Sequence, residues 1–175
     1  MKNHFKLMAA YNLRINKQIY KAALELDKSD LEKDMGAFFG SVLATLNHIM
    51  VGDLLWLSRI EHHSDRYESL SSISEFASPS ALNDILYQDI DDLHEKRNKL
   101  DGIIVDWVGE TEESDFHKLF SYKNMKGKEE RKVFGEVVSH FFNHQTHHRG
   151  QVSTLLNQLG KDVGITDFII DIPRK

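Results

Sequence analysis

Four histidines that lie within nine residues of one another are the side chains in this sequence most suited to chemistry. They are His140, His144, His147 and His148, in a stretch whose apolar residues recur at helical spacing. At about 100° per residue, His144 lies about 40° from His140 around the helix axis, His148 about 80° and His147 about −20°. All four therefore share one side of a predicted helix.

The apolar residues of the same helix divide these histidines into two pairs. Its buried face centres at about 110° on the same scale, so His144 and His148 point inward while His140 and His147 lie on the flank. Two imidazoles at positions i and i+4 are the usual helical pair of ligands for a divalent metal. The zinc-protease motif is excluded, because Gln145 stands where that motif requires glutamate.

A third candidate ligand, His48, lies in an almost entirely apolar stretch, and Gly52 leaves open space beside it one turn later. Each feature also has a structural interpretation. An i, i+4 pair often arises by chance, and a histidine in an apolar helix is commonly a core residue that hydrogen-bonds to backbone or water. Burying three imidazoles is costly unless something satisfies their nitrogen atoms, which favours a metal site formed by His48, His144 and His148.

The helices that must position these histidines can be predicted from the remaining sequence. The chain has only two prolines, and its apolar residues recur at intervals of three and four, which indicates an all-α protein. The third helix is expected to begin at Ser78-Pro79, an N-cap followed by proline at the first helical position. The fourth helix is expected to end before Gly160. The predicted helices span residues 8–26, 38–60, 78–107 and 129–159.

The segments between and after these helices have patterns of their own. Residues 61–80 contain seven serines and predict a loop in which His62 and His63 are solvated. Weak alternation of aromatic residues ahead of Asn124 and Gly127 indicates a short hairpin before the last helix. Residues 161–175 end in the apolar side chains of Phe168, Ile169, Ile170 and Ile172, and we expect this segment to dock on the helices or on a partner chain.

Composition restricts the classes of function. A length of 175 residues with 41% hydrophobic residues fits a single domain, residues 1–175. The absence of cysteine excludes disulfide bonds, thiolate metal sites and a cysteine nucleophile. A net charge of −5 without a basic patch argues against nucleic acid, and no apolar stretch approaches the roughly 20 residues of a membrane span. We expect a cytoplasmic protein, because the residues after Lys2 and Lys6 do not form a signal peptide.

Two segments resemble the DinB family of four-helix proteins. One is Thr-Leu-Asn-His-Ile at residues 45–49, followed by Asp53 and Trp56, and the other is the string HFFNHQTHHRGQ at residues 140–151. The resemblance covers most of the chain in the expected order. It implies an up-down-down-up four-helix bundle of the DinB/YfiT-like type, commonly homodimeric, in which a divalent metal ion is held by His48, His144 and His148.

The resemblance also implies a class of reaction. Members of this superfamily include transferases and isomerases that use a low-molecular-weight thiol such as bacillithiol, mycothiol or glutathione. We therefore expect a metal-dependent transferase in which the metal lowers the pKa of an exogenous thiol that attacks a small-molecule substrate. Two alternatives remain open. One is a hydrolase that uses metal-bound water, with His147 or His140 relaying protons. The other is a non-enzymatic metal-binding or stress-response protein.

The identity of the metal and the roles of three further residues are also open. Three imidazoles suit zinc or nickel, and also iron or copper. Asp53 is expected to be a buried carboxylate that either accepts a hydrogen bond from a metal-bound histidine or pairs with Arg149 or with backbone. Arg149 points away from His144, which favours a structural role. Trp56 either belongs to the core or forms a wall of a substrate pocket near His48.

Overall fold

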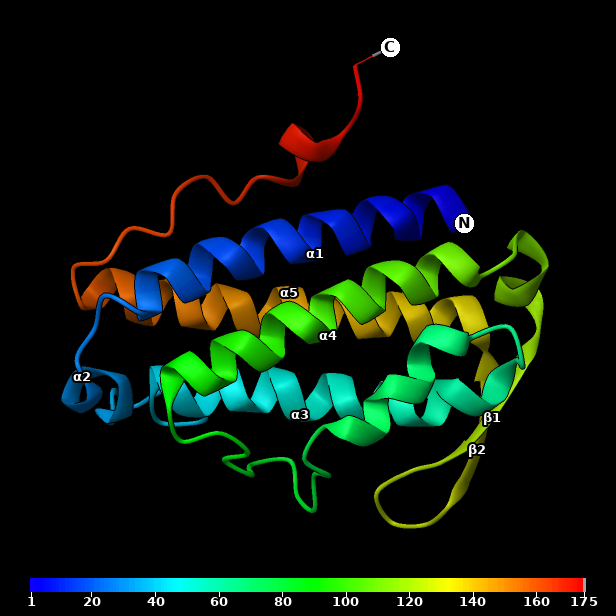
Figure 1. Ribbon diagram of the computed structural model, residues 1–175, viewed down its shortest axis with the longest axis horizontal. Coiled ribbons are helices and arrows are strands. Elements are labelled where there is room, and N and C mark those ends of the chain that lie inside the picture. Colours follow the sequence, from blue (N-terminus) through cyan, green and yellow to red (C-terminus); the bar gives the residue numbers. More distant parts are fainter. Residues whose placement is uncertain (175) are drawn as a thin grey trace.

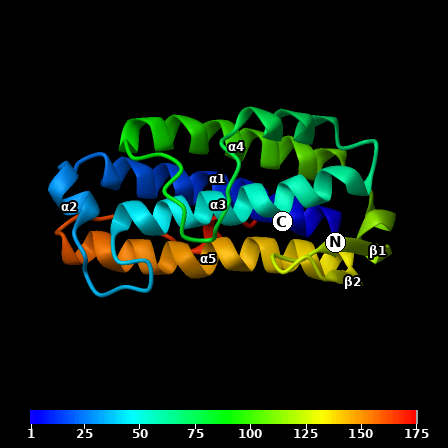
Figure 2. The same ribbon diagram turned by 90° about the horizontal axis from the view of Figure 1, so that it is seen from below.

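Within residues 1–174, which the computed structural model describes, four long helices run alongside one another (Figures 1 and 2). Helix α1 contacts α4 and α5, and α3 contacts α5. A short helix, α2, follows α1. The protein is therefore mostly helical, as predicted. Lys175, the last residue of the predicted C-terminal segment, lies outside the described residues. The α-helices are α1 (Lys2–Ala23), α2 (Lys28–Glu32), α3 (Val42–Ile60), α4 (Ile90–Glu110) and α5 (Phe134–Gln158).

A two-stranded antiparallel sheet precedes α5 and confirms the predicted hairpin. Strand β1 (Leu119–Lys123) pairs with β2 (Glu129–Val133). The turn between them contains Gly127 at a φ of 73°, a left-handed conformation that glycine adopts without steric cost. The prediction that the last helix begins at residue 129 is wrong, because residues 129–133 form hydrogen bonds to β1 instead.

Helix α4 begins at Ile90 and not at the predicted Ser78-Pro79. The carboxylate of its N-cap, Asp89, accepts hydrogen bonds from the backbone N–H groups of Asp91 and Asp92. The segment before it is held in a non-helical path by Asn47 of α3. The Asn47 side chain donates to the carbonyl of Tyr87 at 2.9 Å and accepts from its N–H at 3.0 Å.

The predicted loop after α3 contains two short 3₁₀ helices, η1 (Glu61–His63) and η2 (Glu68–Glu75). His63 is half-buried, with its ring centroid 4.4 Å from that of Phe134, so the prediction that it is solvated is wrong. Burial lowers the pKa of His63. Two further 3₁₀ helices are η3 (Glu113–His117) and η4 (Phe168–Asp171).

A polar network of five buried side chains crosses the apolar core between the long helices. We call it the interior network, and its members are Asn12, Asn16, Asp53, Arg97 and Asp101. Arg97 of α4 donates to Asp53 of α3 at 2.5 Å and to Asp101 at 2.7 Å. The amide groups of Asn12 and Asn16, both on α1, donate to Asp101 at 2.9 Å. These five side chains connect α1, α3 and α4, and the hydrogen bond from the buried Arg149 of α5 to Asn12 extends the network to a fourth helix.

The ion-pair partner that the sequence suggested for Asp53 is not the one observed. Asp53 pairs with Arg97, whereas Arg149 donates a hydrogen bond to Asn12. The buried position of Arg149 agrees with the structural role that was expected for it. Trp107 is fully buried in the core.

The C-terminal arm, residues 161–174, leaves the end of α5 and runs back along the outside of α1 (Figure 1). Phe168 packs edge-on against Tyr11 of α1, with ring centroids 5.1 Å apart, so part of the arm docks on the helices as expected. Its isoleucines instead face outward: Ile169 is 69% exposed and Ile170 54%. No helix among the described residues is both long enough and apolar enough to span a bilayer.

Candidate metal centre

His48 of α3 meets His144 and His148 of α5 at the contact between these two helices. The Nε2 atom of His48 lies 3.1 Å from Nε2 of His144 and 3.2 Å from Nε2 of His148. We call these three side chains the histidine triad. His48 is 5% exposed and His148 9%, whereas His144 is partly buried, so of the pair predicted to point inward His148 is the more buried. Three ring nitrogens thus converge on one point within reach of a single ion.

The other ring nitrogen of two triad members is already bonded to an oxygen atom. Nδ1 of His48 lies 2.8 Å from the carbonyl oxygen of Leu82, and Nδ1 of His148 lies 2.8 Å from Oε1 of Gln151. Because these oxygens only accept, each Nδ1 must donate, which leaves a lone pair on each Nε2. Two lone pairs that face each other at 3.2 Å repel unless a cation or a proton lies between them.

The spacing of the triad fits a divalent transition metal. A tetrahedral ion with metal–nitrogen distances of about 2.0–2.1 Å places its nitrogen ligands about 3.3–3.4 Å apart. The Nε2 atoms of the triad are 3.1 and 3.2 Å apart, so little movement is needed to reach that geometry. Three protein ligands leave at least one coordination position for an exogenous molecule.

The triad is in the protonation state that binds metal. Burial lowers the pKa of all three imidazoles below the ordinary histidine value. The pKa of His144 falls to about 3, because burial and the neighbouring imidazoles of His148 and His48 all disfavour its charged form. The three rings are therefore neutral near pH 7, as metal ligation requires.

The residues next to the triad fix the positions of its rings. A Cβ atom built on Gly52 would lie 2.6 Å from Cε1 of His144, so this ring can lie against α3 only because position 52 is glycine. Phe39, in the loop before α3, stacks on His48 with ring centroids 3.8 Å apart and an interplanar angle of 20°. Sequence reasoning missed the contacts of Phe39 and of the Leu82 carbonyl, because it placed both residues inside predicted helices (38–60 and 78–107), whereas both lie in loops.

Two of the four clustered histidines lie outside the triad, as their helical angles predicted. His147 is exposed. His140 is also exposed and packs edge-on against Trp56, with ring centroids 5.3 Å apart. Trp56 itself is partly buried against the core, and it also lines a pocket whose other residues include His140. Asp53 bonds to Arg97 and not to a triad histidine.

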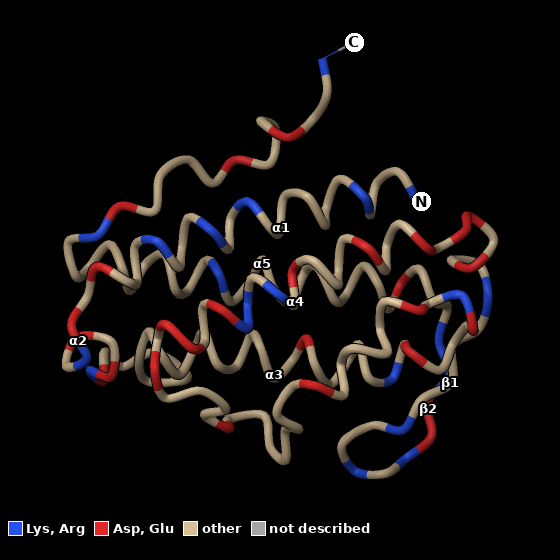
Figure 3. Tube along the Cα trace, viewed as in Figure 1, with Lys and Arg blue, Asp and Glu red and all other residues tan. Residues whose placement is uncertain are grey.

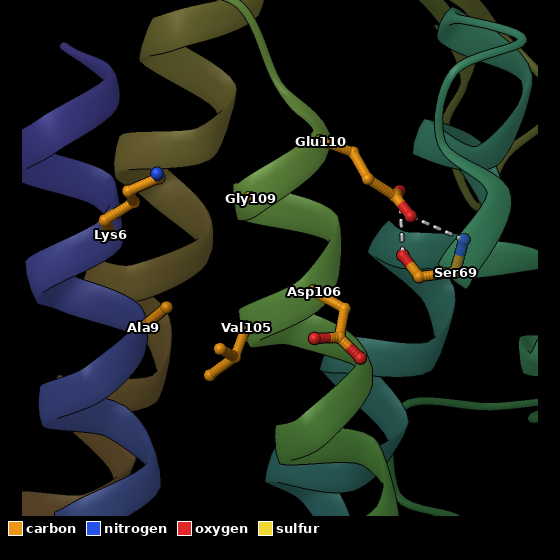
Figure 4. Close-up of a pocket in the computed structure, with 7 residues that line it drawn as sticks. All are labelled: Lys6, Ala9, Ser69, Val105, Asp106, Gly109 and Glu110. Carbon is orange, nitrogen blue, oxygen red and sulfur yellow. Dashed lines mark hydrogen bonds between the residues drawn. The ribbon is translucent and has the colours of Figure 1, made fainter.

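A groove between α1 and α4 is separate from the triad (Figure 4). Its volume is about 670 Å³. The carboxylate of Glu110 on its wall already accepts hydrogen bonds from the backbone N–H and the hydroxyl of Ser69, at 3.0 and 2.9 Å. No triad residue lines this groove, so it does not contribute to the candidate metal centre.

Comparison with known proteins supports the resemblance seen in the sequence. The family model described as DinB family matches residues 1–174. Protein DinB of Bacillus subtilis (strain 168) is 23% identical over 164 residues, which cover 94% of this chain and 90% of that protein. No solved structure matches the chain significantly. Because the family model spans nearly the whole chain, the protein belongs to the DinB family.

Proposed function

We propose that this protein binds one divalent transition metal ion through His48, His144 and His148. The observation that carries the proposal is the convergence of three neutral imidazoles whose Nε2 atoms face one another. A buried arrangement of this kind is costly without an ion to accept the lone pairs. The all-nitrogen ligand set favours zinc or nickel, and iron or copper are also suited to it.

We further propose that the centre serves a metal-dependent transferase that acts with an exogenous low-molecular-weight thiol. A divalent ion bound there supplies a Lewis acid with an open position, at which the pKa of a thiol is lowered. The chain's own residues hold the centre in place: Leu82 and Gln151 orient two rings, and Phe39 packs over His48. Because the chain contains no cysteine, the sulfur nucleophile must come from outside.

For the assembly, we propose one DinB-like domain, residues 1–175, whose long helices form the up-down-down-up four-helix bundle of the family. We also propose a cytoplasmic homodimer with a small-molecule substrate. The long helices that lie side by side support the four-helix bundle. The outward-facing side chains of Ile169, Ile170 and Ile172 support the association of two copies. Light scattering coupled to size-exclusion chromatography measures the mass directly, and a monomer at all concentrations contradicts the dimer.

Elemental analysis by inductively coupled plasma mass spectrometry tests the metal site. Untagged protein purified without chelators should contain about one transition metal ion per chain. The variant His48→Ala should lose the ion, while His147→Ala, which removes an exposed histidine from the same helix, should retain it. A wild-type protein that neither carries nor takes up metal contradicts the proposal.

A conjugation assay then tests the reaction. The metal-loaded protein is incubated with a low-molecular-weight thiol and the electrophile 1-chloro-2,4-dinitrobenzene, and the rate is compared with that of His48→Ala. A faster rate for the wild type supports the transferase. Metal-dependent hydrolysis of a model ester in place of conjugation identifies a hydrolase, and a metal-loaded protein without either activity identifies a non-enzymatic binding protein.

A further inference from the structure

A pocket of about 260 Å³ lies beside the histidine triad, where α3, α5 and the β1–β2 hairpin meet. We call it the aromatic pocket. His140 links it to the triad, because this residue lies one turn before His144 on α5 and the two ring centroids are 6.1 Å apart. The residues that line the pocket are Trp56, Tyr122, Lys132, Glu136, Val137 and His140.

Three rings give the pocket an apolar interior. The ring centroid of Trp56 is 5.2 Å from that of Tyr122 and 5.3 Å from that of His140, with interplanar angles of 62° and 69°. The Arg59 guanidinium lies 5.0 Å from the Trp56 ring and 5.6 Å from the Tyr122 ring, a contact that holds the two rings together. Val137 adds a buried aliphatic side chain. The apolar surfaces are therefore already in position for a ligand.

Two opposite charges complete the lining. Lys132 comes from β2 and Glu136 from the first turn of α5. Among the ion pairs formed within residues 1–174, none involves either side chain. Figure 3 shows that acidic and basic residues follow one another along the hairpin. The pocket thus presents one ammonium and one carboxylate, both without a charged protein partner, beside an aromatic interior.

We propose that the aromatic pocket binds a small zwitterion, an α-amino acid or a similar amine–carboxylate compound with an apolar or aromatic body. The body packs against Trp56 and Tyr122, the ligand carboxylate pairs with Lys132, and the ligand ammonium pairs with Glu136. A ligand with a carboxylate but no ammonium would leave Glu136 without a partner of opposite charge. A ligand with an ammonium but no carboxylate would leave Lys132 without one. The volume lies below the usual range of roughly 300–1,000 Å³ for ligand pockets, so the ligand is small.

The location of the pocket suggests its use. A molecule bound in the pocket lies next to His140 and hence beside the triad. A transferase with its metal at the triad would bind one of its two substrates at such a position. This assignment of a substrate rests on the proposed function. Binding of the zwitterion does not, because none of the six lining residues belongs to the triad.

Three probes with the same aromatic body test the charge requirement: phenylalanine, 3-phenylpropionate and phenethylamine. Binding is followed by two-dimensional NMR of the ¹⁵N-labelled protein, in which the indole signal of Trp56 reports on the pocket. Phenylalanine should bind about fivefold more tightly than either singly charged probe, since one exposed ion pair contributes up to about 1 kcal/mol. Equal affinities, tighter binding of a singly charged probe, or no binding of phenylalanine at its solubility limit overturns the proposal.

Charge-removing variants assign each contact. Lys132→Met should bring the affinity for phenylalanine down to that for phenethylamine. Glu136→Gln should bring the affinity for phenylalanine down to that for 3-phenylpropionate. Lys123→Met and Glu129→Gln serve as controls. These two residues pair with each other across the same hairpin and lie outside the pocket, so removing their charges should leave the relative affinities of the three probes unchanged. If these control variants reduce the selectivity as much, the effect is one of general charge and the proposal fails.

The same titration with His48→Ala separates this proposal from the metal site. Phenylalanine binding that persists in this variant supports the aromatic pocket even where the metal proposal fails. Binding that disappears with His48 places the ligand at the triad and overturns the pocket assignment.

Discussion

At the scale of single residues, the candidate centre depends on which nitrogen of each imidazole is free. The carbonyl of Leu82 and the side chain of Gln151 hold the Nδ1 atoms of His48 and His148, so that their Nε2 lone pairs point toward the third ring. Such outer contacts fix the tautomer and the orientation of a ligand before the ion arrives. The affinity of the centre therefore depends on residues that never touch the ion.

The first prediction concerns Gln151. Replacing it with leucine removes the acceptor for His148 Nδ1 and should weaken metal binding about 10- to 100-fold. Gln151→Glu retains an oxygen at this position and should bind metal nearly as tightly as the wild type. Competition with a coloured chelator measures both affinities, and an unchanged affinity in Gln151→Leu argues against an orienting role.

The second prediction concerns Gly52. The added methyl group of Gly52→Ala would lie 2.6 Å from Cε1 of His144 and must displace this ring, so the bound ion should be lost. Gly102→Ala, in helix α4, is the matched control, because a Cβ there meets nothing within 4 Å. That variant should keep the ion and gain about 0.4–1 kcal/mol of stability. Full metal content in Gly52→Ala contradicts the packing described.

The third prediction concerns pH. The pKa of His144 is about 3 in the folded protein and near its ordinary value of 6.5 in the unfolded chain. Between these values the unfolded chain takes up a proton that the folded one does not, so the metal-free protein should lose stability as the pH falls from 6.5 toward 3. Urea unfolding at several pH values measures this loss. His144→Leu should show a weaker dependence on pH, and an identical dependence counts against the lowered pKa.

At the scale of elements, the interior network connects α1, α3 and α4 through one guanidinium group. Arg97 is the single cation between the carboxylates of Asp53 and Asp101, and all three side chains are fully or almost fully buried. Removing it leaves two buried carboxylates without a directly bonded cation, and only the more distant Arg149 then offsets their charge. The network thus makes the relative positions of these helices sensitive to a single residue.

The fourth prediction concerns this network. Arg97→Met should destabilise the protein by about 3–5 kcal/mol, or prevent folding. Lys99→Met, on the same helix, breaks the exposed pair with Glu75 and a cation–π contact with Phe76, and should cost less than about 1 kcal/mol. Denaturant unfolding followed by circular dichroism compares the two variants, and equal losses would show that the burial of Arg97 has no energetic consequence.

The middles of the helices could be predicted from sequence, whereas their ends could not. Apolar spacing placed the bodies of α1, α3 and α5 correctly. Ser78-Pro79 and Asp89 are both good helix starts, and Asn47 decides between them by bonding to the backbone of Tyr87. That contact joins residues 40 positions apart, so no local pattern reveals it.

The candidate site could be predicted to the level of its three histidines, because helical angles alone bring His144 and His148 to the buried face. Their neighbours were harder to find. Phe39 and Leu82 reach His48 from loops, whereas apolar spacing had placed both residues inside predicted helices. The partner of Asp53 did have a signal: Arg97 occupies a position in the apolar stripe of its own helix, where a charge requires a buried counter-charge.

At the scale of the whole molecule, the candidate centre joins the second turn of α3 to the middle of α5. An ion that binds the folded chain and not the unfolded one stabilises the fold by mass action. At a free metal concentration 100 times Kd the gain is about 2.7 kcal/mol. For a chain of this size, that corresponds to a rise in Tm of roughly 5–11 °C.

The fifth prediction follows from this gain. Calorimetry of metal-free wild type should show Tm rising on addition of zinc or nickel, while His48→Ala should show little change. His147→Ala should behave like the wild type, since its exposed ring contributes no ligand. Equal rises in all three proteins indicate binding elsewhere on the surface.

The distance between the triad members along the chain has a further consequence. His48 and His148 are 100 residues apart, so an ion shared by them closes a loop of that length. In the chain-entropy description of disulfides, a cross-link across about 100 residues stabilises a fold by roughly 4–5 kcal/mol, chiefly by restricting the unfolded chain. In a protein without cysteine, the ion would be a reversible cross-link, removed by a chelator as a reductant removes a disulfide. Access to metal would then determine how long each molecule survives partial unfolding and proteolysis.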